Sequence, residues 1–195
     1  TFISSKGTGL CVEGGGKAAL EQECVLSNNG GELSNCAKIG VFVTGKGSMV
    51  SAQHCQADGN GDPNIMVRSG AAVSLLHVSS NGSRGAHGWD VSDKGSTLVA
   101  AHSCASHNGG CGAIVSDGAC LQALSFQSVG NKLEGAGAQR NSSITLADAQ
   151  CKENGRYGWF AGSNCCFTAR DSQSVENKRG NTSESRGGRI IRMDS

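Results

Sequence analysis

Aromatic residues, proline and long apolar runs are all scarce in this chain of 195 residues. Aromatic residues make up 4% of it, and Pro63 is its one proline. Together with 30 glycines, these shortages fit a thin core of small aliphatic side chains. No apolar run approaches the roughly 18 residues that a membrane-spanning helix needs, so we expect no membrane span.

The chain also lacks an excess of charge of either sign, because its formal net charge is +1. Nucleic-acid binding needs a concentrated basic face. The segment from Lys178 to Arg192 is locally basic, but Glu184 interrupts it and no aromatic residues are interleaved. We therefore expect no nucleic-acid partner.

Cysteine patterns that are typical of metal sites are absent. No CxxC pair occurs, and no set of cysteines and histidines has zinc-finger spacing. We therefore expect neither a metal nor a cofactor.

What the chain does contain is a repeat of 23 or 24 residues, clearest between Gly112 and Gly158. Glycines and asparagines recur there at intervals of 23, namely Gly112, Gly135 and Gly158, and Asn108, Asn131, Asn154 and Asn177. Steps of 24 backwards from Gly112 reach Gly88, Asn64 and Gly40, and a longer step of 31 reaches Gly9. A fixed period of this length is the signature of a solenoid.

Apolar residues within each copy are spaced by two, which predicts β-strands rather than helices. The second strand of each copy should turn two columns of residues inward: Ala18, Met49, Val73, Thr97, Leu121, Ile144 and Phe167, and then Leu20, Ser51, Leu75, Val99, Ala123, Leu146 and Ala169. The prediction is an all-β, single-domain, right-handed parallel β-helix over residues 1–195, with seven to eight coils. Because the chain has no initiator methionine, we interpret it as a mature or excised segment of a larger chain.

An asparagine closes most copies, and a glycine opens most of them. The series Asn28, Asn60, Asn108, Asn131, Asn154 and Asn177 resembles the internal asparagine ladder of pectate-lyase-like β-helices, in which each side-chain amide bonds to the next coil. The opening glycines suit turns that need a positive φ. Through this repeat alone, almost the whole chain resembles the pectate-lyase-like right-handed β-helix superfamily.

This resemblance implies two kinds of function. The superfamily includes polysaccharide lyases, glycoside hydrolases and epimerases, which use carboxylates and an Arg or Lys in a groove along one sheet. It also includes non-catalytic repeat modules of the carbohydrate-binding and sugar-hydrolase (CASH) type. The chain has neither the calcium-binding aspartate cluster of pectate lyases nor the motifs of polygalacturonases, so no catalytic residue of the family can be carried over.

The best catalytic candidates from the residues alone are Asp148 and Asp171, with Arg170 beside them in sequence. The two aspartates occupy the same place in adjacent coils, about 5 Å apart. Paired carboxylates at that separation can act as acid and nucleophile in glycoside hydrolysis. The alternative is an ordinary pair of solvated surface residues. Three histidines also recur at similar places, without a triad partner: His54, His77 and His102.

A column on the outer side of the first strand is unusually apolar. It consists of Cys11, Phe42, Met66, Asp90, Ile114, Gly137 and Phe160, each two residues after the start of a copy. A contiguous exposed apolar stripe usually marks an interaction surface. We expect Phe42, Met66, Ile114 and Phe160 to bind a protein partner or an adjacent domain. Longer loops near residues 30–38 and 178–187 are further candidates, because insertions in solenoids often lie on a binding face.

The ten cysteines allow two interpretations. Four fall near equivalent third-strand places and predict a buried ladder: Cys24, Cys55, Cys104 and Cys151. Three lie at or near turns and are the better disulfide candidates: Cys11, Cys36 and Cys111. Cys120 and Cys166 share a column, but a coil lies between them, which is too far for a disulfide. A secreted or lumenal location and an intracellular one both remain open.

For function, the sequence predicts a non-catalytic β-helix module that acts as a structural or binding scaffold in a larger protein or assembly. The alternative is a carbohydrate-active protein, either polysaccharide-binding or a lyase or hydrolase, that uses a groove along one sheet. Asp148, Asp171 and Arg170 would then form its site.

Overall fold

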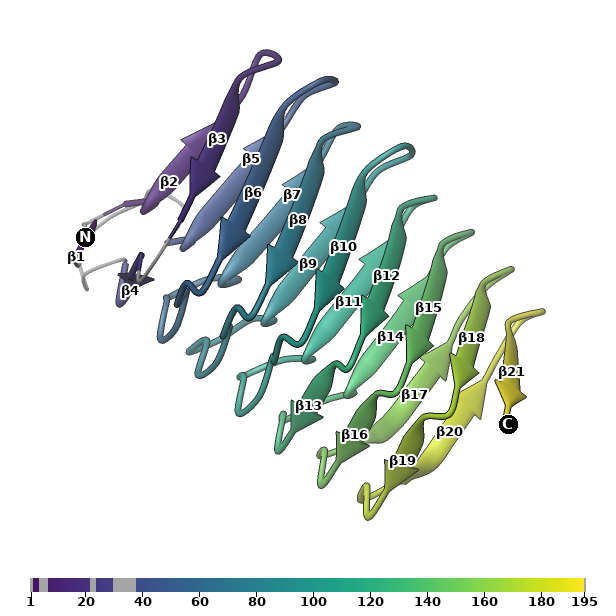
Figure 1. Ribbon diagram of the computed structural model, residues 1–195. Helices are drawn as coiled ribbons and strands as arrows, with labels where there is room; N and C mark the ends of the chain where they lie inside the picture. The colour runs from purple at the N-terminus through teal and green to yellow at the C-terminus, as the bar shows by residue number, and fades with distance from the viewer. Residues whose placement is uncertain (1, 4–6, 22–23, 30–37, 195) are drawn as a thin grey trace.

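Strands and turns account for all the residues that the computed structural model describes, which are 2–3, 7–21, 24–29 and 38–194. The strands stack in about seven parallel coils (Figure 1), so the predicted all-β parallel solenoid is confirmed. None of these described segments forms a helix long and apolar enough to cross a membrane.

Each coil, including the incomplete last one, contributes one strand to each of two eight-stranded parallel sheets. The first sheet contains, in stacking order, β2 (Leu10–Val12), β5 (Val41–Thr44), β7 (Ile65–Arg68), β9 (Trp89–Ser92), β11 (Ala113–Ser116), β14 (Ala136–Gln139), β17 (Tyr157–Ala161) and β20 (Gly180–Glu184). The second contains β3 (Lys17–Leu20), β6 (Met49–Gln53), β8 (Ala72–Leu76), β10 (Thr97–Ala101), β12 (Cys120–Leu124), β15 (Ser143–Ala147), β18 (Cys166–Arg170) and β21 (Arg189–Met193).

The third side of each coil is shorter. Its regular strands are β13 (Gln127–Val129), β16 (Gln150–Lys152) and β19 (Gln173–Val175). Single parallel bridges continue this side through earlier coils, at Val25, Gln56, Ser79, Cys104 and Gln127. In the first coil, β4 (Leu26–Ser27) pairs with β1 (Phe2–Ile3).

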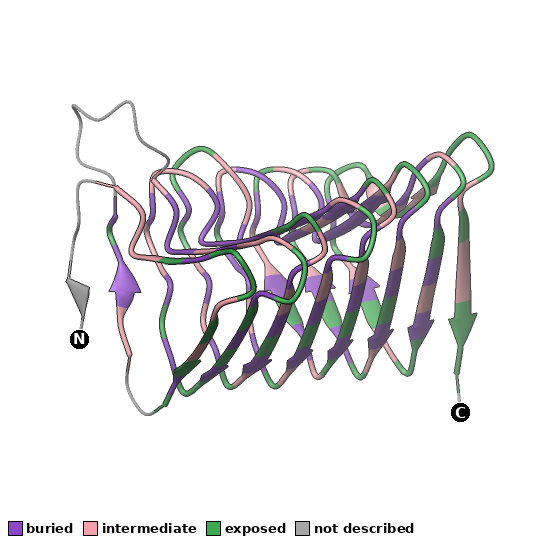
Figure 2. Cartoon of the chain, turned by 90° about the horizontal axis from the view of Figure 1, so that it is seen from above, coloured by how far each residue is buried: buried purple, intermediate pink, exposed green. Residues whose placement is uncertain are grey.

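Small aliphatic residues fill the space between the sheets, as the composition predicts. Strands of the second sheet alternate buried and outward-facing residues, which Figure 2 shows as alternating colours along each arrow. Two aromatic contacts add bulk to this core. The rings of Trp89 and Phe126 lie 4.7 Å apart, and those of Trp159 and Phe167 lie 5.8 Å apart. Most residues of the last coil are exposed or half-buried.

The predicted register of the second sheet is wrong in two coils. Four residues expected in the core lie on the outer side: Met49, Ser51, Thr97 and Val99. In each case the next residue along the chain takes the core position: Val50, Ala52, Leu98 and Ala100. The preceding turn has four residues in these coils, 45–48 and 93–96, but three in the coil between them, 69–71. Since alternate residues face opposite sides, one extra turn residue moves every later side chain by one place.

The asparagine ladder is present in the turn from the third side to the first sheet. The backbone N and Nδ2 of Asn108 donate to Oδ1 of Asn131, at 2.9 and 3.0 Å. Equivalent pairs of bonds join Asn131 to Asn154 and Asn154 to Asn177. In the first coil the ladder residue is the buried Asn29 and not Asn28, which is an exposed turn residue with φ 58°.

One coil lacks a ladder asparagine and replaces it from another position. Ser83 stands at this place, and its N–H donates to Oδ1 of Asn108 at 2.9 Å. Asn64, which is fully buried, supplies the missing amide. Its Oδ1 accepts from Nδ2 of Asn60 at 2.8 Å, and its Nδ2 donates to Oδ1 of Asn108 at 3.2 Å. This bridge explains why this coil opens with an asparagine where most coils have glycine. Asn181 opens the last coil in the same way, and its Oδ1 accepts from Nδ2 of Asn177 at 3.4 Å.

The glycines that open the coils provide space rather than a special backbone conformation. None of them has a positive φ, so the expectation that they serve positive-φ turns is wrong. A Cβ on Gly88 would lie 2.7 Å from Nδ2 of Asn108 and 2.8 Å from Cβ of Ala105. Both distances are too short for a real Cβ contact. The glycine therefore leaves room for the ladder side chain.

The predicted longer loop near residues 178–187 contains strand β20, so it is not a loop insertion. The period of 23 continues there, because Thr182 pairs with Trp159 and Arg189 pairs with Cys166. The other predicted loop, 30–38, lies outside the described residues except for Lys38.

The predicted four-cysteine ladder is also wrong. Cys55, Cys104 and Cys151 lie one, two and three residues after the bend into the third side, so they occupy different columns. Cys24 and Cys55 alone hold equivalent places among these four.

Candidate functional site

The column of residues two positions after each coil start is in register along the first sheet. Its members follow one another as paired residues of successive strands: Cys11, Phe42, Met66, Asp90, Ile114, Gly137 and Phe160. Met66 is 8% exposed, whereas Phe42, Ile114 and Phe160 are half-buried. Asp90 divides the apolar members into two groups.

The group formed by Ile114 and Phe160 closes over a glycine. A Cβ on Gly137 would lie 3.1 Å from Cδ1 of Ile114 and 3.8 Å from Cδ1 of Phe160. The two larger side chains thus lean into the space above Gly137. With Gly137 they form an apolar patch across three strands, β11, β14 and β17.

Ile114 and Phe160 line a groove of about 590 Å³ along the first sheet, which we call the first-sheet groove. Asp90 is the third member of the column in its lining, whereas Phe42 and Met66 are not part of it. The other charged or titratable lining residues come from the strand ends and turns: Arg68, His87, Asp93, Asp117, Glu134, Arg140 and Arg156. Tyr157 and Phe160 supply its aromatic surface.

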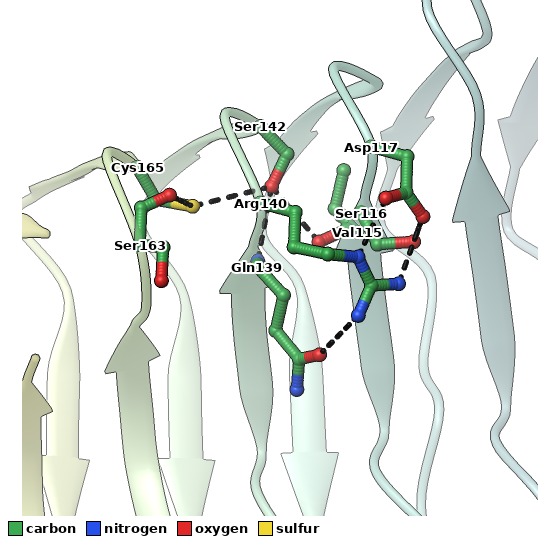
Figure 3. A network of polar contacts seen from close by, with 8 residues as sticks. All are labelled: Val115, Ser116, Asp117, Gln139, Arg140, Ser142, Ser163 and Cys165. Carbon is green, nitrogen blue, oxygen red and sulfur yellow. Dashed lines mark hydrogen bonds and ion pairs between the residues drawn. The ribbon is translucent and has the colours of Figure 1, made fainter. Parts of the chain in front are cut away.

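An ion pair marks the groove end that lies nearest the turns to the second sheet (Figure 3). The guanidinium Nη2 of Arg140 donates to Oδ2 of Asp117 at 2.8 Å, and the hydroxyl of Ser116 donates to the same oxygen at 2.9 Å. Arg140 and then Ser116 hold the pKa of Asp117 at about 2. The carboxyl group therefore remains ionised at neutral pH. Because both side chains are well exposed, this pair contributes little to stability.

A second polar cluster lies on the opposite side of the groove and is more buried. The N–H of Cys111 donates to Nδ1 of His87 at 2.9 Å, and Sγ of Cys111 donates to Oε2 of Glu134 at 3.3 Å. Nη1 of Arg156 lies 3.6 Å from the other oxygen of Glu134. The cluster therefore holds one carboxylate between a thiol and a guanidinium.

Burial sets the protonation of this cluster. It raises the pKa of the Cys111 thiol far above its usual range, so the sulfur remains protonated and is not an activated nucleophile. Burial also lowers the pKa of His87, against the opposing effects of Asp90 and Glu134. The neutral ring fits the hydrogen bond that Nδ1 accepts. Burial raises the pKa of Asp90, against the effects of His87 and of Arg68, whose Nη2 is 3.6 Å from Asp90.

Chemically, the first-sheet groove is suited to binding. Three of its carboxylates are paired with arginines, its thiol is protonated, and its apolar patch lies between the charged groups. Within the described residues no group of three or more His, Cys, Asp or Glu side chains could hold a metal ion.

Asp148 and Asp171, the predicted catalytic pair, lie outside this groove. Both occupy the bend from the second sheet to the third side, with φ 49° and 47°, and both are exposed. The N–H of Asp148 donates to the carbonyl of Arg170 at 3.0 Å, which places the aspartates in adjacent coils. Arg170 is exposed on the last position of β18.

The same bend position explains why these residues recur. Earlier coils hold His54, His77, His102 and Ser125 there, each with φ close to 50°. Short polar residues tolerate this left-handed conformation better than most. The three histidine rings stack, with centroids 4.8 and 5.1 Å apart. Asp148 and Asp171 thus continue a column of bend residues.

Sequence reasoning missed the buried half of the groove. His87, Cys111, Glu134 and Tyr157 each immediately precede a coil start, so the period alone places them in one column. Reading that column would have revealed a histidine, a thiol and a carboxylate in successive coils. Arg68 is the last residue of β7, and Arg140 directly follows β14. Charged residues are common at strand ends, so neither arginine gives a distinct signal in the sequence.

Comparisons with protein-family models, curated proteins and solved structures found no match to this chain. The parallel β-solenoid is therefore established by its own strand pairing.

Proposed function

We propose that this chain is a non-catalytic β-helix module that binds a partner protein, or an adjacent domain, through the first-sheet groove. The observation that carries the proposal is the apolar patch of Ile114 and Phe160 beside Gly137, with ion pairs on either side. Protein interfaces commonly have an apolar centre and a polar rim. A rigid stack of paired strands also presents such a surface without having to order it on binding.

Several features of the other candidate site favour binding over catalysis. Asp148 and Asp171 are exposed bend residues and line none of the grooves that we find along the described coils. Catalytic carboxylates usually lie in a cleft that shifts their pKa. The CASH-type modules within the pectate-lyase-like superfamily provide the nearest analogy for such a non-catalytic role.

Charged substitution within the groove tests the proposal. Ile114→Asp replaces an apolar side chain of the groove with a carboxylate next to Asp90. We expect this charge to abolish partner association. Val99→Asp is the matched control, because Val99 is 48% exposed on the second sheet, away from the groove. Cross-linking and affinity capture should recover the same partner with wild type and Val99→Asp, but not with Ile114→Asp. Equal recovery with all three would reject the groove as the binding surface.

Polysaccharide binding is the second candidate, and the groove lining gives it a specific basis. Tyr157 and Phe160 offer aromatic surface beside arginines and carboxylates that can hydrogen-bond hydroxyl groups. Incubation with neutral and acidic polysaccharides distinguishes the cases. Binding that is lost in Arg156→Ala without new reducing ends or unsaturated products would favour a lectin-like module. Product formation that is lost in Asp148→Asn would instead favour an enzyme that uses Asp148, Asp171 and Arg170.

A further inference from the structure

Cys24 and Cys55 occupy equivalent places in successive coils. The N–H of Gln56 donates to the carbonyl of Cys24 at 2.8 Å, and the N–H of Leu26 donates to the carbonyl of Gln56 at 2.7 Å. These bonds pair Val25 with Gln56, so the residues that precede them are adjacent. Neighbouring strands lie about 4.8 Å apart. Disulfides join Cα atoms that are roughly 4.4–6.8 Å apart, which includes this spacing.

Both side chains point toward the interior of the solenoid. Cys55 is 3% exposed, and Cys24 is half-buried and packs against the same core. Backbone carbonyls of the same coil or the one before lie within reach of each thiol: those of Gln53 at 3.0 Å and Leu20 at 3.6 Å for Cys55, and that of Glu21 at 3.8 Å for Cys24. Burial is the main cause of the raised pKa of Cys55, and interaction with Cys24 also contributes.

No other described cysteine has a cysteine at the equivalent place of a neighbouring coil. Cys11 is paired with Phe42, and Cys104 lies between Ser79 and Gln127 of the adjacent coils. In the same way, Cys120 lies between Thr97 and Ser143, Cys151 between Ser128 and Ser174, and Cys166 between Ser143 and Arg189. The buried thiols of Cys111 and Cys165 lie beside Glu134 and Ser142. Cys11 and Cys111, predicted as disulfide candidates, are therefore free thiols that do not face each other. Cys36 lies outside the described residues.

We propose that Cys24 and Cys55 form a reversible disulfide, joining their two coils when the protein meets an oxidised thiol compound such as glutathione disulfide. The thiolate of Cys24, which is the more accessible, attacks one sulfur of glutathione disulfide. One glutathione remains bonded to Cys24 and the other leaves as a thiolate. The thiolate of Cys55 then attacks the Cys24 sulfur and releases the second glutathione. The two protein thiols lose two protons and two electrons, and one glutathione disulfide is reduced to two molecules of glutathione.

Peptide mapping of the wild-type chain after incubation with glutathione disulfide tests this proposal. Cleavage after Glu23 and Glu32, combined with cleavage after Lys38, Lys46 and Arg68, places Cys24, Cys36 and Cys55 each on its own peptide. We expect a peptide of residues 24–32 linked to the peptide that contains Cys55, and the loss of two thiols from this pair. Dithiothreitol should reverse both changes.

Two variants provide the controls. Cys166→Ser removes an exposed thiol that has no cysteine in the neighbouring coils, and it should leave the linked peptide unchanged. Cys24→Ser should abolish the link and also abolish any rise in the guanidinium midpoint of unfolding on oxidation. Two results would overturn the proposal. One is a peptide in which Cys24 is linked to a different cysteine. The other is that Cys24 and Cys55 both remain unlinked when Cys166 has reacted completely with glutathione. Since the mapping uses the wild-type chain, it does not depend on how well a variant folds.

Discussion

Gly135 directly precedes strand β14 and Gly137 lies within it. A methyl group added to one glycine would contact different atoms from a methyl group added to the other. At Gly135 it would meet Nδ2 of Asn154 and the carbonyl of Gly158 at 2.8 Å, and Cβ of Cys151 at 2.9 Å. At Gly137 its nearest neighbour is the flexible end of Ile114 at 3.1 Å. Backbone and ladder atoms cannot move away as that side chain can.

We therefore expect Gly135→Ala to lower the free energy of unfolding by about 1–3 kcal/mol, the usual cost of overpacking. Gly137→Ala should lower it by less than about 1 kcal/mol, because side-chain rotation relieves the contact. Guanidinium unfolding of both variants compares the two effects directly. Equal destabilisation would mean that the start glycines do not serve the ladder.

His87 gives the fold a dependence on pH. Burial lowers the pKa of His87, so the folded state binds fewer protons at this ring than the unfolded state. Its contribution to stability is complete above the ordinary histidine pKa of about 6.5 and is lost as the pH falls through the lowered value. Protonation of Nδ1 would also remove the bond that it accepts from the N–H of Cys111.

The expected result is a fall in the unfolding midpoint between neutral pH and about pH 5, smaller in His87→Gln than in wild type. Asp90 opposes this trend, because its folded pKa is raised and acid therefore favours its folded form. Asp90→Asn consequently serves as the control, and it should steepen the loss rather than reduce it. An unchanged slope in His87→Gln would exclude His87 as the titrating group.

At the scale of strands and turns, the fold tolerates two lengths of the turn that leads from the first sheet to the second. In the longer turn the N–H of Ser48 donates to the carbonyl of Gly45 at 3.0 Å, and in the shorter the N–H of Ala71 donates to the carbonyl of Arg68 at 3.2 Å. Both turns are closed by the same type of bond, so the strands on either side keep their pairing.

Deletion of Lys46 should therefore convert the longer turn into the shorter one and change the free energy of unfolding by less than about 1.5 kcal/mol. Deletion of Ser51, five residues later within β6, should prevent folding, because Ala52 and the residues after it would exchange their inner and outer sides. Circular dichroism and guanidinium unfolding of the two deletions measure the difference. A severe effect of the Lys46 deletion would show that turn length is fixed in each coil.

The same variation limits what sequence reasoning can establish. A spacing of two identifies the strands, and a period of 23 identifies the coils, so the all-β parallel solenoid could be predicted. Neither signal reveals which turns have an extra residue, because both lengths contain glycine and serine. The spacing consequently predicts Met49 and Val99 in the core, although both face outward. The prediction of Asn28 rather than Asn29 as the ladder residue is wrong for a similar reason. The two asparagines are adjacent in sequence, and only the geometry of the turn decides which side chain points inward.

At the scale of the whole molecule, the first-sheet groove exists only because separate coils are stacked. Ile114 and Phe160 are 46 residues apart in the chain, and both border the space above Gly137, which lies between them in the sheet. The alignment of this column and its division by Asp90 could be predicted from the period. The burial of Glu134 could not, because it depends on neighbouring side chains from other columns.

Asn64 supplies the ladder amide that is missing at Ser83. This arrangement limits how coils of such a chain can be duplicated or lost. Ser83, which leaves the gap, and Asn64, which fills it, both belong to the coil of residues 64–87. That coil carries its defect and its compensation together. It could be gained or lost as a single genetic unit, which would leave Asn60 to face Asn108 and Gly88 to follow Gly40 at the coil starts. Exchange of fragments that separates residue 64 from residue 83 would instead break the ladder, so we expect recombination to be tolerated better at the ends of this coil than within it.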